Sequence, residues 1–307
     1  MSAVDSVLLI AFGGPGRPED VRPFLQIVTA GRRIPAARLE EVARHYERIG
    51  GASPLNTLTR AQAAGLSAAL AVQGRSLPVW VGMRNWHPFL HETLADMADR
   101  GRRRAVGIIL SSLQTEASWA RYVDDVLAAR EKVGPAAPEV VFVSAWSDHP
   151  SFIDAMVDRT RRALEEIDAE RRAEARLIFT AHSVPVAMAE GSPYAGELDA
   201  VARRVADRLG WLRWSIAYQS RSGSPRDPWL EPDVGDVIRT MAADGARDVV
   251  VIPVGFVCDH VEVLYDLDVE AREIAQGAGV GFHRAIAAND HPAFIAMLAE
   301  LVRREAP

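Results

Sequence analysis

Residues 253–270 read PVGFVCDHVEVLYDLDVE and follow directly on an apolar run, DVVVI, that begins at Asp248. The run has the continuous aliphatic composition of a strand that is buried on both faces. Beyond Gly255 the apolar residues change to helical spacing. The stretch therefore predicts a strand, a tight turn and a helix, which is the unit from which parallel α/β sheets are built.

The helical part of this stretch carries a row of acids. Glu262, Asp266 and Glu270 recur every fourth residue, so an α-helix would place their carboxylates on one ridge. We expect the sheet-facing side chains to be Val261, Leu264, Tyr265 and Val269. Such a row is often only a solvated helix face. Its position just after a strand end instead favours a path for a divalent cation.

Composition limits the classes of function. The 307 residues include 41 acidic and 35 basic side chains, so the formal net charge of −6 argues against a nucleic-acid partner. Cys258 is the single cysteine, which excludes an internal disulfide framework and a cysteine-only metal centre within one chain.

The start of the chain, MSAVDSVLLIAFGGPG, predicts a first strand, because it lacks a basic region and its apolar run stops at Gly13. No apolar run approaches the roughly 20 residues that a membrane-spanning helix needs. We therefore expect a cytoplasmic protein without a transmembrane segment.

Two successive βα patterns predict the fold. The expected strands are 6–12, 77–83, 105–110 and 139–144 in the first half, and 176–181, 214–218, 248–254 and 280–284 in the second. A long helix over 150–174 joins the halves, and a last helix covers 292–304. We predict an α/β protein with two Rossmann-like domains, 1–150 and 151–290, each a four-stranded parallel sheet flanked by helices, followed by a C-terminal helix in 291–307.

Two loop features of the first half have ordinary explanations. The glycines of GGPGRPEDV, from Gly13, lack both the G-x-G-x-x-G spacing and the lysine of a phosphate-binding loop, so they predict a tight turn. Ser112, Thr115 and Ser118 follow the third strand, and we expect them to cap the helix that runs to about Lys132.

His182 is the histidine that the pattern favours for chemistry. It ends the predicted strand 176–181 and should lie near Glu262 at the same edge of the second sheet, where the two side chains could transfer protons or bind a divalent cation. The competing histidines are His87, His91, His260 and His283. His260 should point to another helix face than Glu262, because it lies two positions before Glu262 in the sequence. A serine hydrolase is disfavoured, since G-x-S-x-G is absent, and Cys258 reads as a small buried residue.

Ordered motifs along the whole chain make it resemble the ferrochelatase family. They are HYERIGGASPLN (45–56), GMRNWHP (82–88), FTAHSVP (179–185), YQSRSG with PWLEPDV (218–234) and GFVCDHVEVLYDLDVE (255–270). The resemblance implies two Rossmann-like domains with a porphyrin cleft between them. It also implies insertion of ferrous iron into a porphyrin, with release of two protons.

The resemblance further implies roles for single residues. His182 and Glu262 match the facing pair at the metal site, and His182 matches the acceptor of pyrrole protons. Asp266 and Glu270 match acidic positions proposed to pass metal or protons inward. Phe12 matches a position on the opposite porphyrin face that is tyrosine in some relatives, so phenolate ligation from that side is lost here.

The resemblance is stronger to the coproporphyrin III branch, in its actinobacterial form, than to the protoporphyrin branch. Coproporphyrin carries four propionates, and loop position suggests as their partners Arg32, Arg33, His45, Ser53, Thr115 and Ser118. We expect Fe²⁺ as a substrate and no permanently bound cofactor. Many actinobacterial and animal relatives carry a [2Fe–2S] cluster on cysteines. This chain has one cysteine, so we expect no cluster. We further expect a monomer that hands coproheme to a downstream decarboxylase.

Four alternatives stay open at this point. They are a protoporphyrin IX ferrochelatase, a cobalt or nickel chelatase for another tetrapyrrole, a non-catalytic haem or porphyrin carrier, and a two-domain small-ligand receptor. The presence of both His182 and Glu262 argues against the carrier, and the acidic row favours iron over cobalt or nickel.

Overall fold

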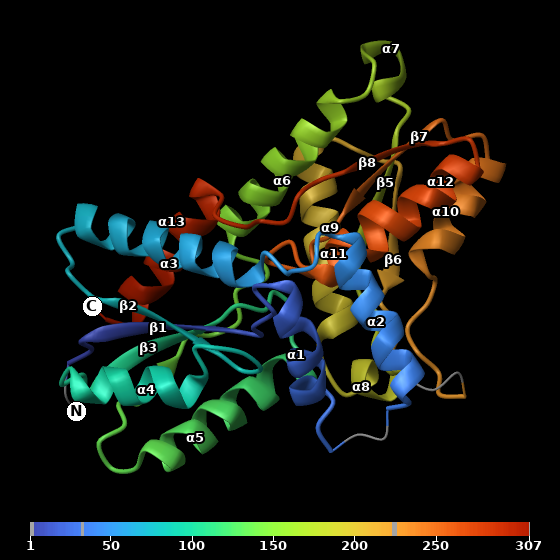
Figure 1. Ribbon diagram of the computed structural model, residues 1–307. Helices are drawn as coiled ribbons and strands as arrows, with labels where there is room; N and C mark the ends of the chain where they lie inside the picture. Colours follow the sequence, from blue (N-terminus) through green and yellow to red (C-terminus); the bar gives the residue numbers. More distant parts are fainter. Residues whose placement is uncertain (1–2, 32–33, 223–225, 307) are drawn as a thin grey trace. The chain divides into compact units, whose positions relative to one another are not determined.

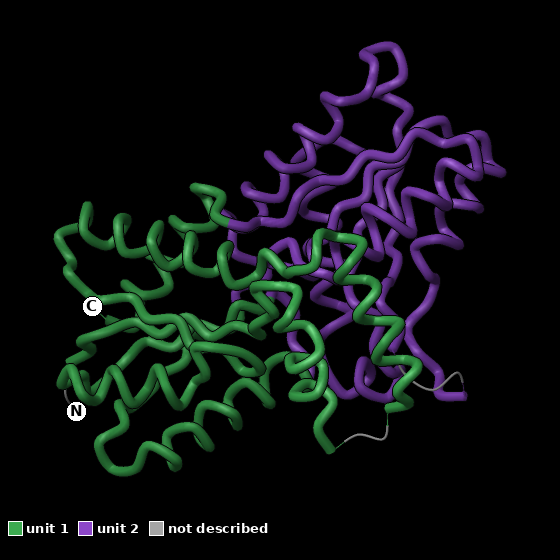
Figure 2. The backbone as a smooth tube through the Cα atoms, viewed as in Figure 1, with its two compact units in different colours: residues 1–111, 117–145, 290–307 green, residues 112–116, 146–289 purple. Residues whose placement is uncertain are grey.

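The computed structural model describes residues 3–31, 34–222 and 226–306 (Figure 1). The chain forms two compact units, which are coloured separately in Figure 2. Unit 1 consists of residues up to 111, 117–145 and from 290 onward. Unit 2 consists of residues 112–116 and 146–289. Arg32 and Arg33, two of the predicted propionate partners, lie outside the described residues.

Unit 1 is built on a four-stranded parallel sheet in the order β2-β1-β3-β4. The strands are β1 (Ser6–Ala11), β2 (Val79–Met83), β3 (Arg104–Ile109) and β4 (Glu139–Phe142). The helical segments are η1 (Pro18–Asp20), α1 (Val21–Val28), α2 (Ala36–Arg48), α3 (Leu55–Val72), α4 (Leu90–Asp99), η2 (Glu116–Ala120, whose first residue belongs to unit 2), α5 (Arg121–Val133) and α13 (Pro292–Glu305). All of β1 is buried, which explains its uninterrupted aliphatic sequence.

Unit 2 repeats the arrangement with a parallel sheet in the order β6-β5-β7-β8. Its strands are β5 (Arg176–His182), β6 (Trp214–Gln219), β7 (Asp248–Ile252) and β8 (Gly281–Arg284). Its helical segments are α6 (Pro150–Glu165), α7 (Ala169–Arg172), α8 (Val186–Glu190), α9 (Tyr194–Leu209), α10 (Val234–Ala243), α11 (Val261–Leu264), η3 (Asp266–Ala271) and α12 (Arg272–Gly277).

The two sheets share one topology, because each has its first strand in sequence between the second and the third. The predicted fold class of two Rossmann-like domains is therefore confirmed. In such sheets the chain leaves neighbouring strands in opposite directions where the strand order reverses, and ligands bind at that point. In unit 2 this point lies between the carboxyl ends of β5 and β7, the strands that precede Ser183 and Pro253 (Figure 1).

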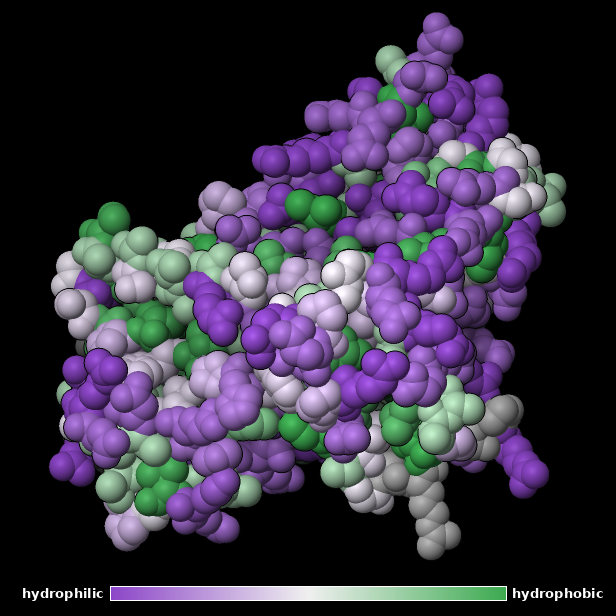
Figure 3. Space-filling view, in the orientation of Figure 1, coloured by the Kyte–Doolittle hydropathy of each residue, from purple (hydrophilic) through white to green (hydrophobic). Residues whose placement is uncertain are grey.

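The prediction of one long helix over 150–174 is wrong. The structure has α6 and then the short α7, with residues 166–168 between them. The chain leaves helical geometry at Asp168, with φ −50° and ψ 135°, and Ile167 beside it in the break is 1% exposed. The charged residues around it lie on the surface, which is mainly hydrophilic over α6 and α7 at the top of Figure 3.

The expected cap of the helix that ends near Lys132 is wrong for Ser112, whereas Thr115, which directly precedes η2, remains a predicted cap. The π-helical η2 comes first, so α5 begins at Arg121 and the preceding residue is Ala120, whose side chain has no acceptor. The hydroxyl of Ser112 instead donates to the carbonyl oxygen of Val254, at 3.0 Å. Among the described helices, none has both the length and the apolar character that a membrane crossing requires.

Candidate functional site

His182 is the last residue of β5, paired in register with Gln219 of β6. The Tyr194 hydroxyl donates to the His182 carbonyl oxygen at 2.8 Å, and the ring Nδ1 contacts the Ser183 carbonyl oxygen. A carbonyl oxygen only accepts hydrogen bonds, so the Nδ1 carries the proton in this contact. In the neutral ring, Nε2 then keeps a free lone pair.

Glu262 lies opposite this nitrogen. His182 Nε2 and Glu262 Oε1 are 3.7 Å apart, and the two side chains keep 27% and 38% of their surface exposed. Glu262 reaches this position from α11, whose chain leaves β7 and turns through Gly255. The amide of Gly255 donates to the Thr180 carbonyl oxygen at 3.0 Å, which ties the turn to β5. The structure thus brings together the two residues that the sequence singled out.

His260 completes the group, and the expectation that it points away from Glu262 is wrong. His260 Nε2 lies 3.3 Å from Glu262 Oε2, and its Nδ1 lies 3.1 Å from the Cys258 carbonyl oxygen. The physical reason is that His260 precedes α11 with an extended backbone, at φ −152°, so helix-face spacing does not apply to it. The motif DHVE held a signal, because a histidine at a helix start can reach an acid of the first turn.

These neighbours set the charge of the group. Burial on its own raises the pKa of Glu262, but His182 and His260 outweigh it and lower that pKa to about 2. Burial lowers the pKa of His260, while its contact with Glu262 raises it to a net value above the ordinary one. Glu262 is therefore an ionised carboxylate at neutral pH, held by imidazoles.

The acidic row does not lie on a continuous α-helix as predicted. The row runs from α11 into η3, a π-helical turn in which the Glu270 amide donates to the Tyr265 carbonyl oxygen at 3.0 Å. Four residues of α-helix overshoot a full turn by roughly 40°, so a regular helix would make the row drift. The wider π turn counteracts this drift between Asp266 and Glu270.

Of the four predicted sheet-facing residues of this segment, Tyr265 is buried and the other three are not. Val263, Leu267, Ala271 and Ala275 are buried in the core of unit 2, whereas Val261, Leu264 and Val269 are only partly buried. The buried set is another every-fourth-residue row, one position after the acids. Sequence spacing alone does not show which of two helix faces, one residue apart in the sequence, packs against the core.

Asp266 is the partly buried middle member of the row. The Ser220 hydroxyl donates to its Oδ2, and Ser220 has a left-handed backbone, with φ 63°. Burial, assisted by the charges of Glu262 and Glu270, raises the pKa of Asp266 to about 7 against the lowering effect of the Ser220 bond. Glu270 is exposed. The row therefore leads from the exposed Glu270 to the partly buried histidine–glutamate group.

Gln219 is a further residue that sequence reasoning missed. It is 1% exposed, and its Nε2 donates to the Glu262 backbone carbonyl oxygen at 2.6 Å. Its Oε1 is buried and has no hydrogen-bond partner among the described residues. Its position at the end of β6, in register with His182, was the available signal.

The predicted porphyrin contacts of unit 1 lie on separate elements. Phe12 follows β1, is 38% exposed, and meets Phe24 edge-to-face with ring centroids 6.4 Å apart. Ser53 is buried before α3, and its hydroxyl accepts from the Leu55 amide at 3.3 Å. His45 is on α2, where burial and then Arg38 lower its pKa.

The remaining two predicted contacts flank the start of η2. Thr115 is buried in the short part of unit 2 before η2, and Ser118 is partly buried within η2. The contact roles of all these residues remain predictions.

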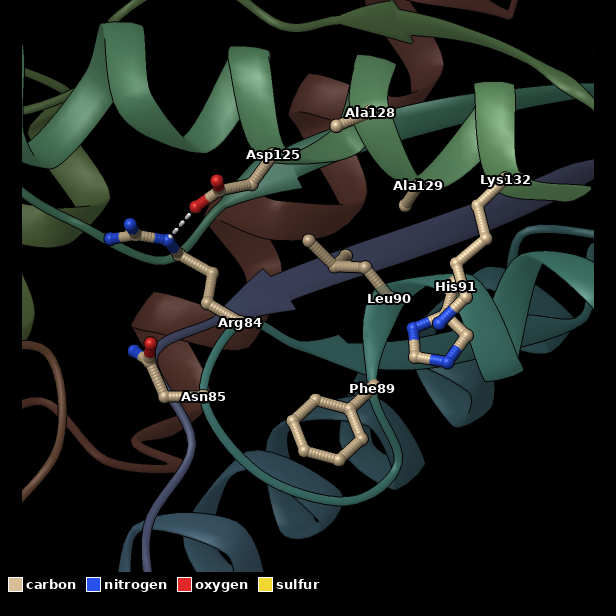
Figure 4. Close-up of a pocket in the computed structure, with 9 residues that line it drawn as sticks. All are labelled: Arg84, Asn85, Phe89, Leu90, His91, Asp125, Ala128, Ala129 and Lys132. Atoms are coloured by element: carbon tan, nitrogen blue, oxygen red, sulfur yellow. Dashed lines mark hydrogen bonds and ion pairs between the residues drawn. The ribbon is translucent and has the colours of Figure 1, made fainter. Parts of the chain in front are cut away.

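A hollow of about 300 Å³ lies elsewhere, within unit 1 (Figure 4). It is lined by residues of the β2–α4 loop, α4 and α5, including His91, Lys132 and the ion pair of Arg84 with Asp125. None of the predicted site residues lines it. Among the described residues, no group of three or more histidine, cysteine or acidic side chains is arranged to hold a metal ion.

Known proteins with similar folds include two chelatase-like structures. SirB from Bacillus subtilis, solved with Fe³⁺, matches 99% of this chain and 96% of its own with a TM-score of 0.59 and 11% identity. DR2241 from Deinococcus radiodurans, described as structurally similar to chelatases, matches 100% of this chain and 56% of its own with a TM-score of 0.58 and 15% identity. At these identities the likeness concerns the fold.

Other known proteins are much more similar to this chain in sequence than these two structures are. The coproporphyrin III ferrochelatase of Nocardia farcinica is 46% identical over 98% of this chain and 88% of its own length. That of Mycolicibacterium smegmatis is 44% identical over 97% and 88%, and the ferrochelatase of Rhodopirellula baltica is 42% identical over 97% and 85%. The family model named Ferrochelatase matches residues 4–306. The chain therefore belongs to the ferrochelatase family.

Proposed function

We propose that this protein inserts ferrous iron into coproporphyrin III, which gives coproheme and releases two protons. The observation that carries the proposal is the approach of His182 Nε2 to Glu262 Oε1, 3.7 Å apart at the end of β5. The names of the actinobacterial relatives, at 42–46% identity, support both the reaction and the porphyrin.

The geometry suits a metal ion that is bound and then given up. A separation of 3.7 Å exceeds a hydrogen bond, but it fits an ion about 2 Å from each of two ligands. With His182 and Glu262 as ligands, several positions of Fe²⁺ stay open to water and then to the porphyrin nitrogens. A closed protein cage would hold the iron instead of releasing it.

We assign the proton steps by pKa. Glu262, with its pKa near 2, is a poor base at neutral pH and serves as the anionic ligand. His182 releases Fe²⁺ from Nε2 as the ion passes to the porphyrin nitrogens, and the same nitrogen then takes a pyrrole proton. Asp266, with its pKa near 7, is matched to accept a proton near neutral pH and pass it along the row to the exposed Glu270.

The same row suits traffic of iron in the other direction. Carboxylate oxygens replace water around a hard cation in steps, so each exchange costs less than full dehydration at once. We further propose Phe12 as an apolar contact of the porphyrin ring. As partners of the four propionates we keep the set Arg32, Arg33, His45, Ser53, Thr115 and Ser118.

The first experiment is anaerobic Fe²⁺ insertion, followed by Soret absorbance, with coproporphyrin III and protoporphyrin IX in parallel. We expect fast insertion into coproporphyrin III. Preference for protoporphyrin IX would keep the mechanism and overturn the substrate. Tight binding of both porphyrins without insertion would make the protein a carrier.

Further parts of the proposal concern cofactors and partners. A [2Fe–2S] cluster held by thiolates needs four cysteines, and this chain has only the buried Cys258, so we propose that it works without a cluster. The product retains its propionates, and we propose transfer to a coproheme decarboxylase. A monomeric state and a cytoplasmic location remain predictions from the sequence.

A further inference from the structure

Arg284, the last residue of β8, has a side chain that is 8% exposed and is held by two carboxylates. Its Nε and Nη2 donate to Asp268 Oδ1 and Oδ2, both at 2.8 Å. Its Nη1 donates to Asp259 Oδ1, also at 2.8 Å. The contact with Asp268 is a bidentate pair, the arrangement that fixes both distance and orientation.

The two carboxylates flank the site residues along the chain. Asp259 directly precedes His260, and Asp268 lies in η3 between Asp266 and Glu270. One guanidinium on a strand of the sheet therefore joins both ends of residues 259–270. We call this arrangement the Arg284 clamp, consisting of Arg284, Asp259 and Asp268.

Asp259 is fixed further by the chain beyond β8. Its amide donates to Asn289 Oδ1, and Asn289 Nδ2 donates to Asp259 Oδ2, both at 2.9 Å. The Ala287 amide donates to Asp259 Oδ1 at 3.3 Å. Because Asn289 is itself buried, the start of the segment is held on several sides.

The clamp also pairs some of the carboxylates of this segment with arginines. Residues 259–270 contain five carboxylates. Two of them, Asp259 and Asp268, belong to the clamp, and Arg272 Nη2 lies 3.5 Å from Asp268 Oδ1 as a second cation. The other three are Glu262, Asp266 and Glu270, the acidic row. The arginines thus neutralise Asp259, before the row, and Asp268, within it, and leave the carboxylates of the row for a cation.

We propose that Arg284 is a positioning residue for metal insertion, one that holds the π turn of η3 and the His260–Glu262 pair in place. The inference rests on the proposed function, because it assigns Arg284 to the same reaction. Arg284 itself acts through the two aspartates, and its contacts are the reason why the segment has one geometry.

The test is Arg284→Lys, which keeps the charge but loses the planar fork that reaches both aspartates. We expect kcat for Fe²⁺ insertion to fall at least 10-fold, while KM for the porphyrin changes less than twofold. The matched control is Arg171→Lys. Arg171 Nη1 lies 3.2 Å from the buried Asp248 at the other end of β7, so this control should keep kcat.

Amide hydrogen exchange of the same variants tests the clamp without any activity. We expect exchange in 259–271 to become at least 10-fold faster in Arg284→Lys and to stay unchanged in 177–182 of β5. Unchanged exchange in 259–271 overturns the inference, as does a kcat within twofold of the wild type. If the wild type inserts no iron, the proposed function fails, and the exchange data still decide on the clamp.

A second variant covers the case in which Arg284→Lys does not fold. Asp268→Asn keeps Arg284 and its bond to Asp259 but removes the ionic bidentate pair. It should show the same fall in kcat with the same porphyrin KM. An equal loss in kcat and in porphyrin affinity would indicate general damage and overturn the inference.

Discussion

The Ser220 hydroxyl donates a hydrogen bond to the Asp266 carboxylate, and so joins the end of β6 to the π turn that follows β7. A hydrogen bond to an ionised carboxylate favours that form and lowers its pKa. In Asp266 this effect opposes burial and two nearby acids. Ser220 therefore sets how far the pKa of Asp266 rises.

Replacing Ser220 tests this relationship. In Ser220→Ala the pKa of Asp266 should rise above its value of about 7, because the lowering bond is lost while burial remains. The titration midpoint of the Asp266 carboxyl carbon, measured by NMR on metal-free protein, checks the shift. The control is Ser192→Ala. The Ser192 hydroxyl donates to the Ala189 carbonyl oxygen at 3.2 Å, and its loss should leave the midpoint unchanged.

Asp266 also makes stability depend on pH. Its pKa in the folded state, about 7, lies above the ordinary 3.8, so the folded state binds the proton more tightly. The resulting stability is fully present below pH 4 and is lost as pH rises through 7. Tm of the metal-free wild type should therefore fall between pH 5 and pH 8 from this group.

Asp266→Asn isolates that contribution, since the amide has a similar shape and does not titrate. Between pH 5 and pH 8, Tm of the variant should fall by fewer degrees than Tm of the wild type. His260, whose pKa is also raised, contributes with the same sign in both proteins and cancels in the difference. Equal slopes in the two proteins would show that Asp266 is ionised throughout.

Glu262 and His182 should differ in what their loss removes. Glu262→Gln keeps the shape but removes the anionic ligand, and His182→Ala removes the proposed base. We expect each to lower kcat on the order of 100-fold or more, with porphyrin binding retained. Porphyrin fluorescence quenching measures binding independently. Full turnover by Glu262→Gln would rule out the paired role.

Gly255 is required where the segment leaves β7. A Cβ added there would lie 2.5 Å from the Ala181 Cβ and 2.7 Å from its Cα. Gly255→Ala should therefore cost about 1–3 kcal/mol of unfolding free energy, because Ala181 belongs to β5 and cannot move aside.

Gly277 provides the matched control in the same unit. It ends α12, and a Cβ there would meet nothing within 4 Å. Gly277→Ala should be neutral or stabilise by about 0.5–1 kcal/mol. Urea unfolding measures the free energy of unfolding of both variants. Equal values for the two variants would contradict the close approach of Gly255 to β5.

The strands and the histidine–acid pair could be predicted because they depend on local pattern. Continuous aliphatic runs mark β5 and β7, and neighbouring parallel strands present their carboxyl ends at one edge. His182 and Glu262 follow from that edge alone. The break after α6 could not be predicted in this way, because ALEEIDAERR contains no glycine or proline to mark the extended backbone of Asp168.

The finer geometry of the site depends on contacts from distant residues. In the π turn the amides of Val269 and Glu270 both donate to the Tyr265 carbonyl oxygen, and the residues around the turn are tied to β8 through Arg284. His260 was misplaced because its extended backbone is outside the helix that its spacing suggested. Both features are decided by tertiary packing rather than by propensity.

All residues proposed for metal and proton handling belong to unit 2, whereas Phe12, His45 and Ser53 belong to unit 1. Mutations that change the choice of metal can therefore accumulate in one unit without altering the fold of the other. Within such a lineage, metal preference and porphyrin preference can diversify separately. A chimaera that exchanges only residues 146–289 with a relative is expected to inherit the metal preference of the donor.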